Sequence, residues 1–110
     1  MDTVLKIPKF RAGDVVKHRR YEYRGVVVGY DETCLASDDW KRRNTSSSDR
    51  DEPWYQVLVH GCTHSTYVAE AYLVPDDSGE QIIHPLVKNY FLRFRRGRYL
   101  SREIDSTRNE

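Results

Sequence analysis

Short segments rich in β-branched and aromatic residues, each bounded by turn residues, constrain the fold of this chain most strongly. Four of them span residues 15–18, 25–30, 54–60 and 65–69. Runs of this length and composition are typical of β-strands. The turn residues at 60–64 separate the last two segments, which predicts a hairpin. Residues 72–75 end in a proline, so an edge strand or a single turn is expected there.

A single helix is expected near the C-terminal end, from residue 85 to residue 95. Pro85 suits a first helical position, and Gly97 suits the residue after a last turn. Apolar residues between them recur at helical spacing and predict a buried stripe that includes Leu86, Tyr90, Phe91 and Phe94. Short strands with one C-terminal α-helix favour a mainly β domain, a small and strongly bent sheet or barrel.

A polar stretch over residues 31–52 interrupts the strand pattern and predicts a long insertion loop at the surface. The tract from Thr45 to Asp49 lacks apolar side chains, so residues 41–52 are expected to be mobile. Leu35 and Trp40 are expected to hold part of the loop to the domain. These features divide the chain into a lead-in at 1–9, one domain at 10–100 and a polar tail at 101–110.

Length and composition exclude several classes of protein. The 110 residues, of mass 13.0 kDa, suffice for one domain with its own core. No apolar run approaches the roughly 18 residues of a membrane-spanning helix, and no secretory signal pattern opens the chain. Two cysteines, Cys34 and Cys62, are too few for a disulfide scaffold. This usage indicates a reducing intracellular setting, in the cytoplasm or the nucleus.

Residues that carry catalysis or bind metals are sparse. The sequence holds no glycine-rich phosphate loop and no nucleophile elbow, so neither an enzyme nor a cofactor is predicted. His60, Cys62 and His64 alternate along the chain and would need a distant fourth ligand such as Cys34. They lack the paired spacing of structural zinc sites, so no metal site is predicted.

Other polar and aromatic residues beside the strands have ordinary structural interpretations. His18 and His84 adjoin apolar segments and are expected to cap turns or to lie at the edge of the core. Trp54 and Tyr55 open a predicted strand and are expected to pack in the core.

Basic residues gather toward the two ends of the domain, although the whole chain has a net charge of only +1. Residues 1–24 carry a net charge of +4, and residues 84–102 carry +6. This segregation of charge can create a local electrostatic field, but an ordinary solvated surface can have the same charge pattern. A further cluster, Lys41-Arg42-Arg43, lies in the insertion. The candidate contact residues are Arg19, Arg20, Tyr21, Tyr23, Arg24, Arg95, Arg96 and Arg98. Arginine matches phosphates and acidic side chains alike, so protein and DNA partners both stay open.

Four blocks of the sequence, in order, resemble one protein family. The blocks are Phe10…Gly13-Asp14-Val15-Val16-Lys17-His18-Arg19-Arg20-Tyr21…Tyr23-Arg24-Gly25-Val26-Val27, Trp54-Tyr55-Gln56-Val57-Leu58-Val59, Tyr67-Val68-Ala69-Glu70…Leu73 and Ile83-His84-Pro85…Tyr90-Phe91…Phe94…Gly97…Tyr99. They cover about residues 10–100 and are similar to the YccV-like family, also called the hemimethylated DNA-binding or heat-shock protein Q family.

The resemblance implies a small SH3-like β-barrel. In such a barrel the two arginine clusters are expected to form one electropositive surface, with Tyr21 and Tyr23 as flat contacts. Bacterial members of the family resemble proteins that bind hemimethylated DNA and adaptors that alter the substrate choice of an energy-dependent protease. The same domain occurs in a eukaryotic F-box protein and in a plastid protease adaptor. The long insertion after Tyr30 is more similar to the F-box type than to the short bacterial form.

These observations predict a non-enzymatic binding module. Its expected role is substrate recognition or adaptor function in protein degradation, with a protein partner or a degradation substrate as ligand. The alternative is a DNA-binding domain of the hemimethylated-DNA-binding type, with double-stranded DNA as ligand. The two differ in salt dependence, because affinity for DNA falls steeply as salt rises. No membrane partner is expected, and the sequence leaves the oligomeric state open.

Overall fold

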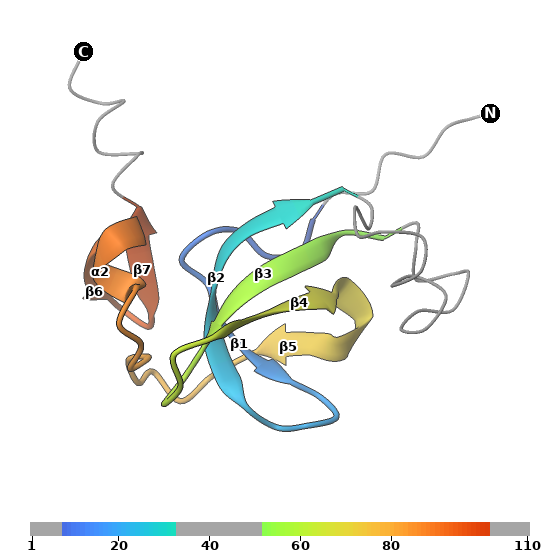
Figure 1. Cartoon of the computed structure of the whole chain (residues 1–110), viewed down its shortest axis with the longest axis horizontal. Helices are drawn as coiled ribbons and strands as arrows, with labels where there is room; N and C mark the ends of the chain where they lie inside the picture. The colour runs from blue at the N-terminus through green and yellow to red at the C-terminus, as the bar shows by residue number, and fades with distance from the viewer. Residues whose placement is uncertain (1–7, 33–51, 102–110) are drawn as a thin grey trace, which may run out of the picture.

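The computed structural model describes residues 8–32 and 52–101 as a mainly β protein (Figure 1). Its elements are β1 (Val15–His18), β2 (Arg24–Asp31), β3 (Trp54–Val59), β4 (Ser65–Ala69), the 3₁₀ turn η2 (Glu70–Tyr72), β5 (Leu73–Pro75), the short helix α2 (Val87–Tyr90), β6 (Phe91–Arg95) and β7 (Arg98–Ser101). The first four strands confirm the predicted strand segments. The segment at 72–75 combines the end of η2 with β5, which is an edge strand.

Five antiparallel strands form one sheet in the order β4-β3-β2-β1-β5, and β6 and β7 form a separate hairpin. The register between β2 and β3 shifts between Val27 and Gly29, which marks a β-bulge. A bulge bends the strand that carries it, so β2 can belong to both halves of a curved sheet. Among the described strands no ladder joins the edge strands β4 and β5, so the sheet is strongly bent but is not described as a closed barrel.

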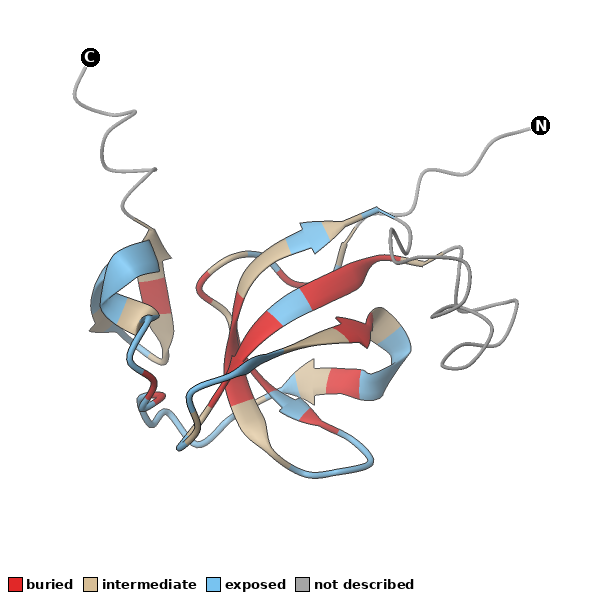
Figure 2. Cartoon of the chain, in the orientation of Figure 1, coloured by how far each residue is buried: buried red, intermediate tan, exposed pale blue. Residues whose placement is uncertain are grey.

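Both faces of the sheet are buried, because consecutive strand residues point to opposite faces. On one face lies a core of seven residues that includes the fully buried Tyr55. On the other face, Val15, Val26 and Leu58 pack against residues that follow β5, namely Ile82, Phe91 and Tyr99. Figure 2 shows the buried positions running along the sheet and recurring in the β6–β7 hairpin. The C-terminal segment is therefore an integral part of the core.

Gly13 joins the β6–β7 hairpin to the sheet. Its N–H donates to the Val27 carbonyl (2.8 Å), and its own carbonyl accepts from the Tyr99 N–H (2.8 Å). A Cβ at this position would collide with the Tyr99 carbonyl, and φ is +103°, a conformation that favours glycine. The close backbone contact thus depends on the absence of a side chain.

The predicted helix at 85–95 is confirmed over only four residues, and its extent is wrong. Helix α2 spans only Val87–Tyr90, and the chain continues directly into β6. The ladder register shifts between Phe91 and Arg93, so Phe91 and Phe94 both pack against the Tyr99 ring although they are three residues apart. The bulge in β6 therefore places two residues that are three apart on the same side of the strand, which is also the spacing of one face of a helix.

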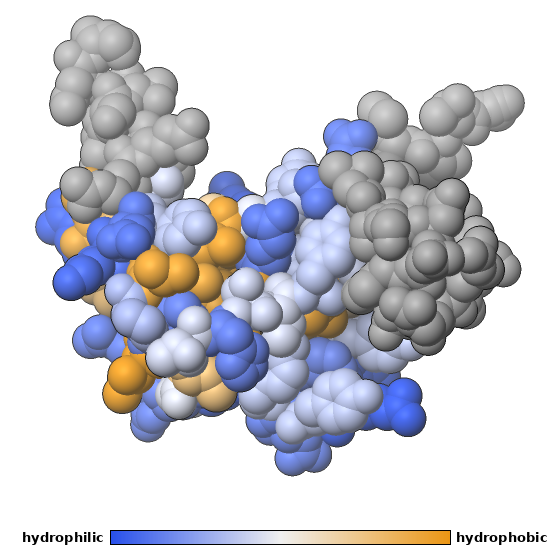
Figure 3. All heavy atoms as spheres, viewed as in Figure 1, coloured by the Kyte–Doolittle hydropathy of each residue, from blue (hydrophilic) through white to orange (hydrophobic). Residues whose placement is uncertain are grey.

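The turn that follows β6 also differs from the predicted helix end. Arg96 and Gly97 both have positive φ, at 54° and 81°, the combination of a two-residue hairpin turn. Of the predicted helix stripe, Phe91 is buried and Phe94 is half-buried, but Leu86 and Tyr90 are exposed. Ile83, Leu86 and Leu92, which lie before and after α2 in the chain, are exposed. Figure 3 shows apolar surface toward the end of the molecule that carries α2 and β6.

Several predictions concern residues outside the described ranges. These are the lead-in before residue 8, the tail after 101, most of the insertion, the expected mobility of 41–52, the packing of Leu35 and Trp40, and the cluster Lys41-Arg42-Arg43. Within the described ranges, no helix is long and apolar enough to cross a membrane.

Candidate binding pocket

An aromatic pocket of about 320 Å³ lies where the β1–β2 turn, β4 and η2 meet. Five of its walls are tyrosine or tryptophan rings and a sixth is an imidazole ring, from Tyr21, Tyr23, Trp54, Tyr67, Tyr72 and His18. Arg20 lies at the same pocket. Concave sites lined by aromatic rings with a few polar groups are the usual form of ligand sites in proteins. We call it the aromatic pocket.

His18 builds the turn that carries one wall of the aromatic pocket. Its Nδ1 accepts hydrogen bonds from the backbone N–H groups of Arg20 and Tyr21, both at 3.1 Å. The ring is 6% exposed and stacks on Tyr72, with centroids 5.9 Å apart and planes 13° apart. Burial, with a smaller contribution from the Arg20 charge, lowers the pKa of His18. The predicted capping role of His18 is confirmed.

The opposite wall is held by side-chain hydrogen bonds. The Tyr23 and Thr66 hydroxyls lie 2.8 Å apart and join the start of β2 to β4. The Tyr67 hydroxyl donates to the Asp31 carboxylate at 2.7 Å, and the Tyr67 ring packs against Trp54 with centroids 5.2 Å apart. These bonds fix the rings before any ligand arrives.

Polar contacts on both sides of η2 place Tyr72 over His18. The Glu70 carboxylate accepts from the Tyr55 hydroxyl at 2.7 Å, and the Ala71 N–H donates to the Glu52 carboxylate at 2.8 Å. The Arg19 guanidinium donates to the Ala71 carbonyl at 2.9 Å. Burial raises the pKa of the Tyr55 hydroxyl, and its bond to Glu70 raises it further.

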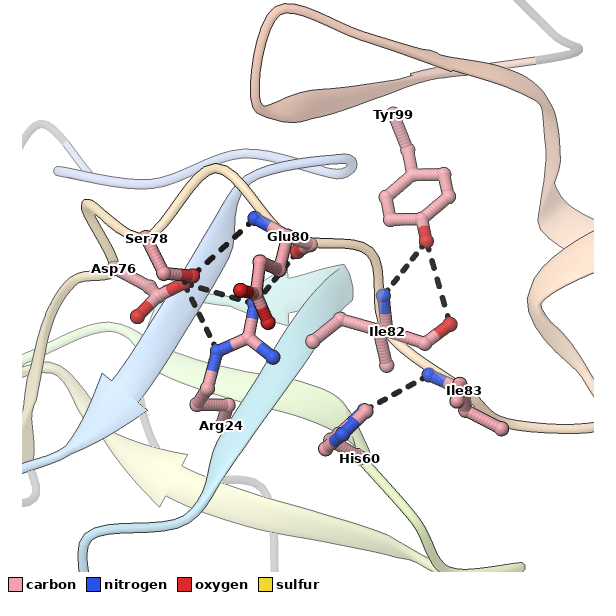
Figure 4. A network of polar contacts seen from close by, with 8 residues as sticks. All are labelled: Arg24, His60, Asp76, Ser78, Glu80, Ile82, Ile83 and Tyr99. Atoms are coloured by element: carbon pink, nitrogen blue, oxygen red, sulfur yellow. Dashed lines mark hydrogen bonds and ion pairs between the residues drawn. The ribbon is translucent and has the colours of Figure 1, made fainter.

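Two of the predicted contact arginines form ion pairs within the scaffold (Figure 4 shows the first). Arg24 pairs with Asp76 at 2.9 Å and donates to the Glu80 carbonyl at 2.6 Å, and the Asp76 side chain is only 9% exposed. Burial alone would raise the pKa of Asp76, but the bonds from Ser78 and Arg24 outweigh it and lower the pKa. Arg98 pairs with Asp14 at 3.0 Å.

The structure does not bring the predicted basic residues onto one surface. Arg20, with Tyr21 and Tyr23, lies on the β1–β2 connection, whereas Arg95 and Arg96 flank the β6–β7 turn. Figure 1 places these two connections at separate ends of the molecule. The tyrosines of the prediction lie at the aromatic pocket, but their role in binding stays a prediction.

Three of the five tyrosine and tryptophan rings of the aromatic pocket were not among the predicted contact residues. Trp54 was interpreted as core, and Tyr67 and Tyr72 were given no role. Trp54 is indeed 3% exposed, so the core interpretation is correct but incomplete. The available signal was the count of eight tyrosines, high for so short a chain, with several beside strand ends. Their convergence needs the curvature of the sheet, which residue spacing does not reveal.

Other candidate sites are weaker. An open hollow of about 690 Å³ adjoins residues 8–11, Asp14, Tyr30 and Arg98, and two of its four charged residues, Asp14 and Arg98, pair with each other. Within the described ranges no three His, Cys, Asp or Glu side chains cluster as metal ligands. His60 Nδ1 accepts instead from the Ile83 N–H at 2.9 Å (Figure 4), and His84, 7% exposed, accepts from the Leu86 N–H at 3.1 Å.

Comparison with known proteins shows what the chain resembles. Residues 8–98 match the family described as hemimethylated DNA-binding protein YccV like. F-box only protein 21 of Mus musculus is 33% identical over 94 residues, which cover 83% of this chain and 15% of that protein. The protein of the same name from Homo sapiens is 32% identical over the same length.

The chain thus spans about a seventh of the length of these relatives. No solved structure matches it. The family is one of binding domains and is named for what it binds, and the match covers nearly all of the described residues. The chain belongs to the YccV-like family.

Proposed function

We propose that this chain is a non-enzymatic module that binds a segment of a protein through the aromatic pocket. We further propose an SH3-like barrel, because the strand order β4-β3-β2-β1-β5, with a 3₁₀ turn between the two edge strands, supports that architecture. The observation that carries the proposed function is the pocket itself, in which hydrogen bonds hold three of the six rings, His18, Tyr23 and Tyr67.

The state of the arginines favours a protein partner over a DNA duplex. Arg24 and Arg98 are held in ion pairs, and Arg19 is held by a backbone carbonyl. Binding to duplex DNA depends on several cations that follow the phosphate backbone together. A pocket of about 320 Å³ suits a short chain segment better than the broad surface of a duplex.

The role in protein degradation, as a substrate-recognition domain or adaptor, rests on resemblance. The likeness to F-box only protein 21 supports it. We propose that this role belongs to ubiquitin-dependent proteolysis. We propose an intracellular setting, cytoplasm or nucleus, on cysteine usage alone.

DNA binding is the second candidate function, and two observations favour it. The family description names hemimethylated DNA. Arg95 and Arg96 are both exposed at the β6–β7 turn. A duplex would contact this turn and leave the aromatic pocket open.

The test is affinity capture from cell lysate, with and without nuclease, with three forms of the chain. These are wild type, the pocket double variant Tyr21→Ala with Tyr72→Ala, and the hairpin double variant Arg95→Glu with Arg96→Glu. We expect protein capture that survives nuclease, falls in the pocket variant and persists in the hairpin variant. Capture that nuclease abolishes, falls steeply with salt and is lost only in the hairpin variant would support DNA binding instead.

A further inference from the structure

We infer that the aromatic pocket takes an extended, acidic segment of the partner protein and seats a proline ring of that segment among its tyrosines. The inference rests on the proposed function, because it names the chemistry of the protein segment. Shape, charge and unpaired hydroxyl groups of the described residues each support a part of it.

The shape of the aromatic pocket suits the compact ring of proline. His18 and Tyr72 are stacked, and the Tyr21 and Tyr23 rings lie tilted against the imidazole, with centroids 4.8 and 5.1 Å from it. Proline-rich segments dock on grooves lined by aromatic rings. Their polyproline II conformation is formed in advance, so little conformational entropy is lost on binding.

The charge at the pocket favours an acidic ligand. Arg20 is the charged side chain that adjoins the pocket among the described residues, and its guanidinium carbon lies 5.8 Å from the centroid of the exposed Tyr21 ring. No described carboxylate lines the pocket, and Glu22 of the same turn is not part of it. The positive charge of Arg20 would repel a cationic ligand such as methylated lysine, although aromatic rings can bind such cations. An aspartate or glutamate next to the proline would pair with Arg20.

Hydroxyl groups at the pocket suit an extended backbone. The Tyr21 and Tyr72 hydroxyls have no hydrogen-bond partner among the described residues, and both side chains are exposed, at 68% and 38%. A polyproline II segment makes no internal hydrogen bonds, so its carbonyl groups are free to accept from these hydroxyls. The Tyr23 and Tyr67 hydroxyls are engaged with Thr66 and Asp31.

The test is selection from a displayed library of random ten-residue peptides, followed by affinity measurement on the enriched peptides. Wild type is compared with the pocket double variant Tyr21→Ala with Tyr72→Ala, and with Arg20→Glu. The matched control is Tyr90→Ala, because Tyr90 is an exposed tyrosine, at 43%, outside the pocket. Thermal unfolding of each variant verifies that the fold is intact.

We expect wild type and Tyr90→Ala to enrich peptides that combine proline with aspartate or glutamate. The pocket variant should bind them about tenfold more weakly or worse, and Arg20→Glu should shift the enriched charge from acidic to basic. Enrichment of basic peptides by wild type, enrichment that the pocket variant retains, or no enrichment would overturn the inference. The proposed function would still stand if nuclease-resistant capture depends on the pocket. Binding of oligonucleotides alone would contradict both.

Discussion

His18 links the stability of the fold to the shape of the aromatic pocket. Its Nδ1 accepts two backbone hydrogen bonds, so this nitrogen carries no proton in the folded chain. Protonation of Nδ1 would break both bonds and place a charge in a buried position beside Arg20. Because the folded chain favours the neutral ring, the pKa of His18 is lowered.

The pH dependence of stability follows from the sign of this shift. The unfolded chain takes up the proton near the ordinary pKa of 6.5, whereas the folded chain takes it up only at lower pH. Acidification from about pH 7 to about pH 5 therefore lowers the free energy of unfolding, with a plateau above the ordinary pKa. Denaturant unfolding of wild type and His18→Asn, which keeps an acceptor but does not titrate, measures the effect. Equal pH slopes in the two proteins would contradict it.

Arg20 and Arg24 are four residues apart but have different predicted roles. Arg24→Ala leaves the largely buried Asp76 carboxylate without its ion-pair partner, so the free energy of unfolding should fall by about 1–3 kcal/mol. Arg20→Ala removes an exposed side chain and should change stability by less than about 0.5 kcal/mol. Denaturant titration compares the two variants directly. Equal loss in both would mean that the Arg24–Asp76 pair does not stabilise the fold.

At the scale of elements, the strands were predictable and the C-terminal hairpin was not. Strands β1 to β4 each have local composition and turn signals that hold without tertiary context. Residues 85–97 also have a local pattern, but the bulge in β6 makes a strand resemble a helix. In the structure, Arg96 and Gly97 both have positive φ and make a hairpin turn rather than a helix end, but arginine is not typical of the first turn position, so the sequence did not reveal the turn.

The β6–β7 hairpin should contribute strongly to stability through one residue. Phe91 is 4% exposed, packs on Tyr99 and belongs to the core of the second sheet face. Phe91→Ala should lower the free energy of unfolding by about 3–5 kcal/mol. The neighbouring Leu92→Ala, at a side chain 45% exposed, should cost less than about 1 kcal/mol. Similar denaturation midpoints for both variants would show that the hairpin is not packed on the sheet.

At the scale of the whole molecule, the candidate site depends on tertiary structure. Arg20, Tyr21 and Tyr23 were identified from one basic and aromatic turn, and they do adjoin the pocket. Trp54, Tyr67 and Tyr72 come from β3, β4 and η2, so only the bent sheet brings them to the same pocket. The single basic surface was not found, because charge counts along a sequence do not reveal that Arg24 and Arg98 are paired internally.

The most direct test of the aromatic pocket as the binding site is an NMR titration of the ¹⁵N-labelled chain with the partner obtained by capture. The amide signals of Arg20, Tyr21, Thr66 and Tyr72 should shift most, because these residues line the pocket from three elements. The amide signals of Arg95, Arg96 and Gly97 should shift little. The largest shifts at this hairpin turn, with unchanged signals around the pocket, would contradict the account.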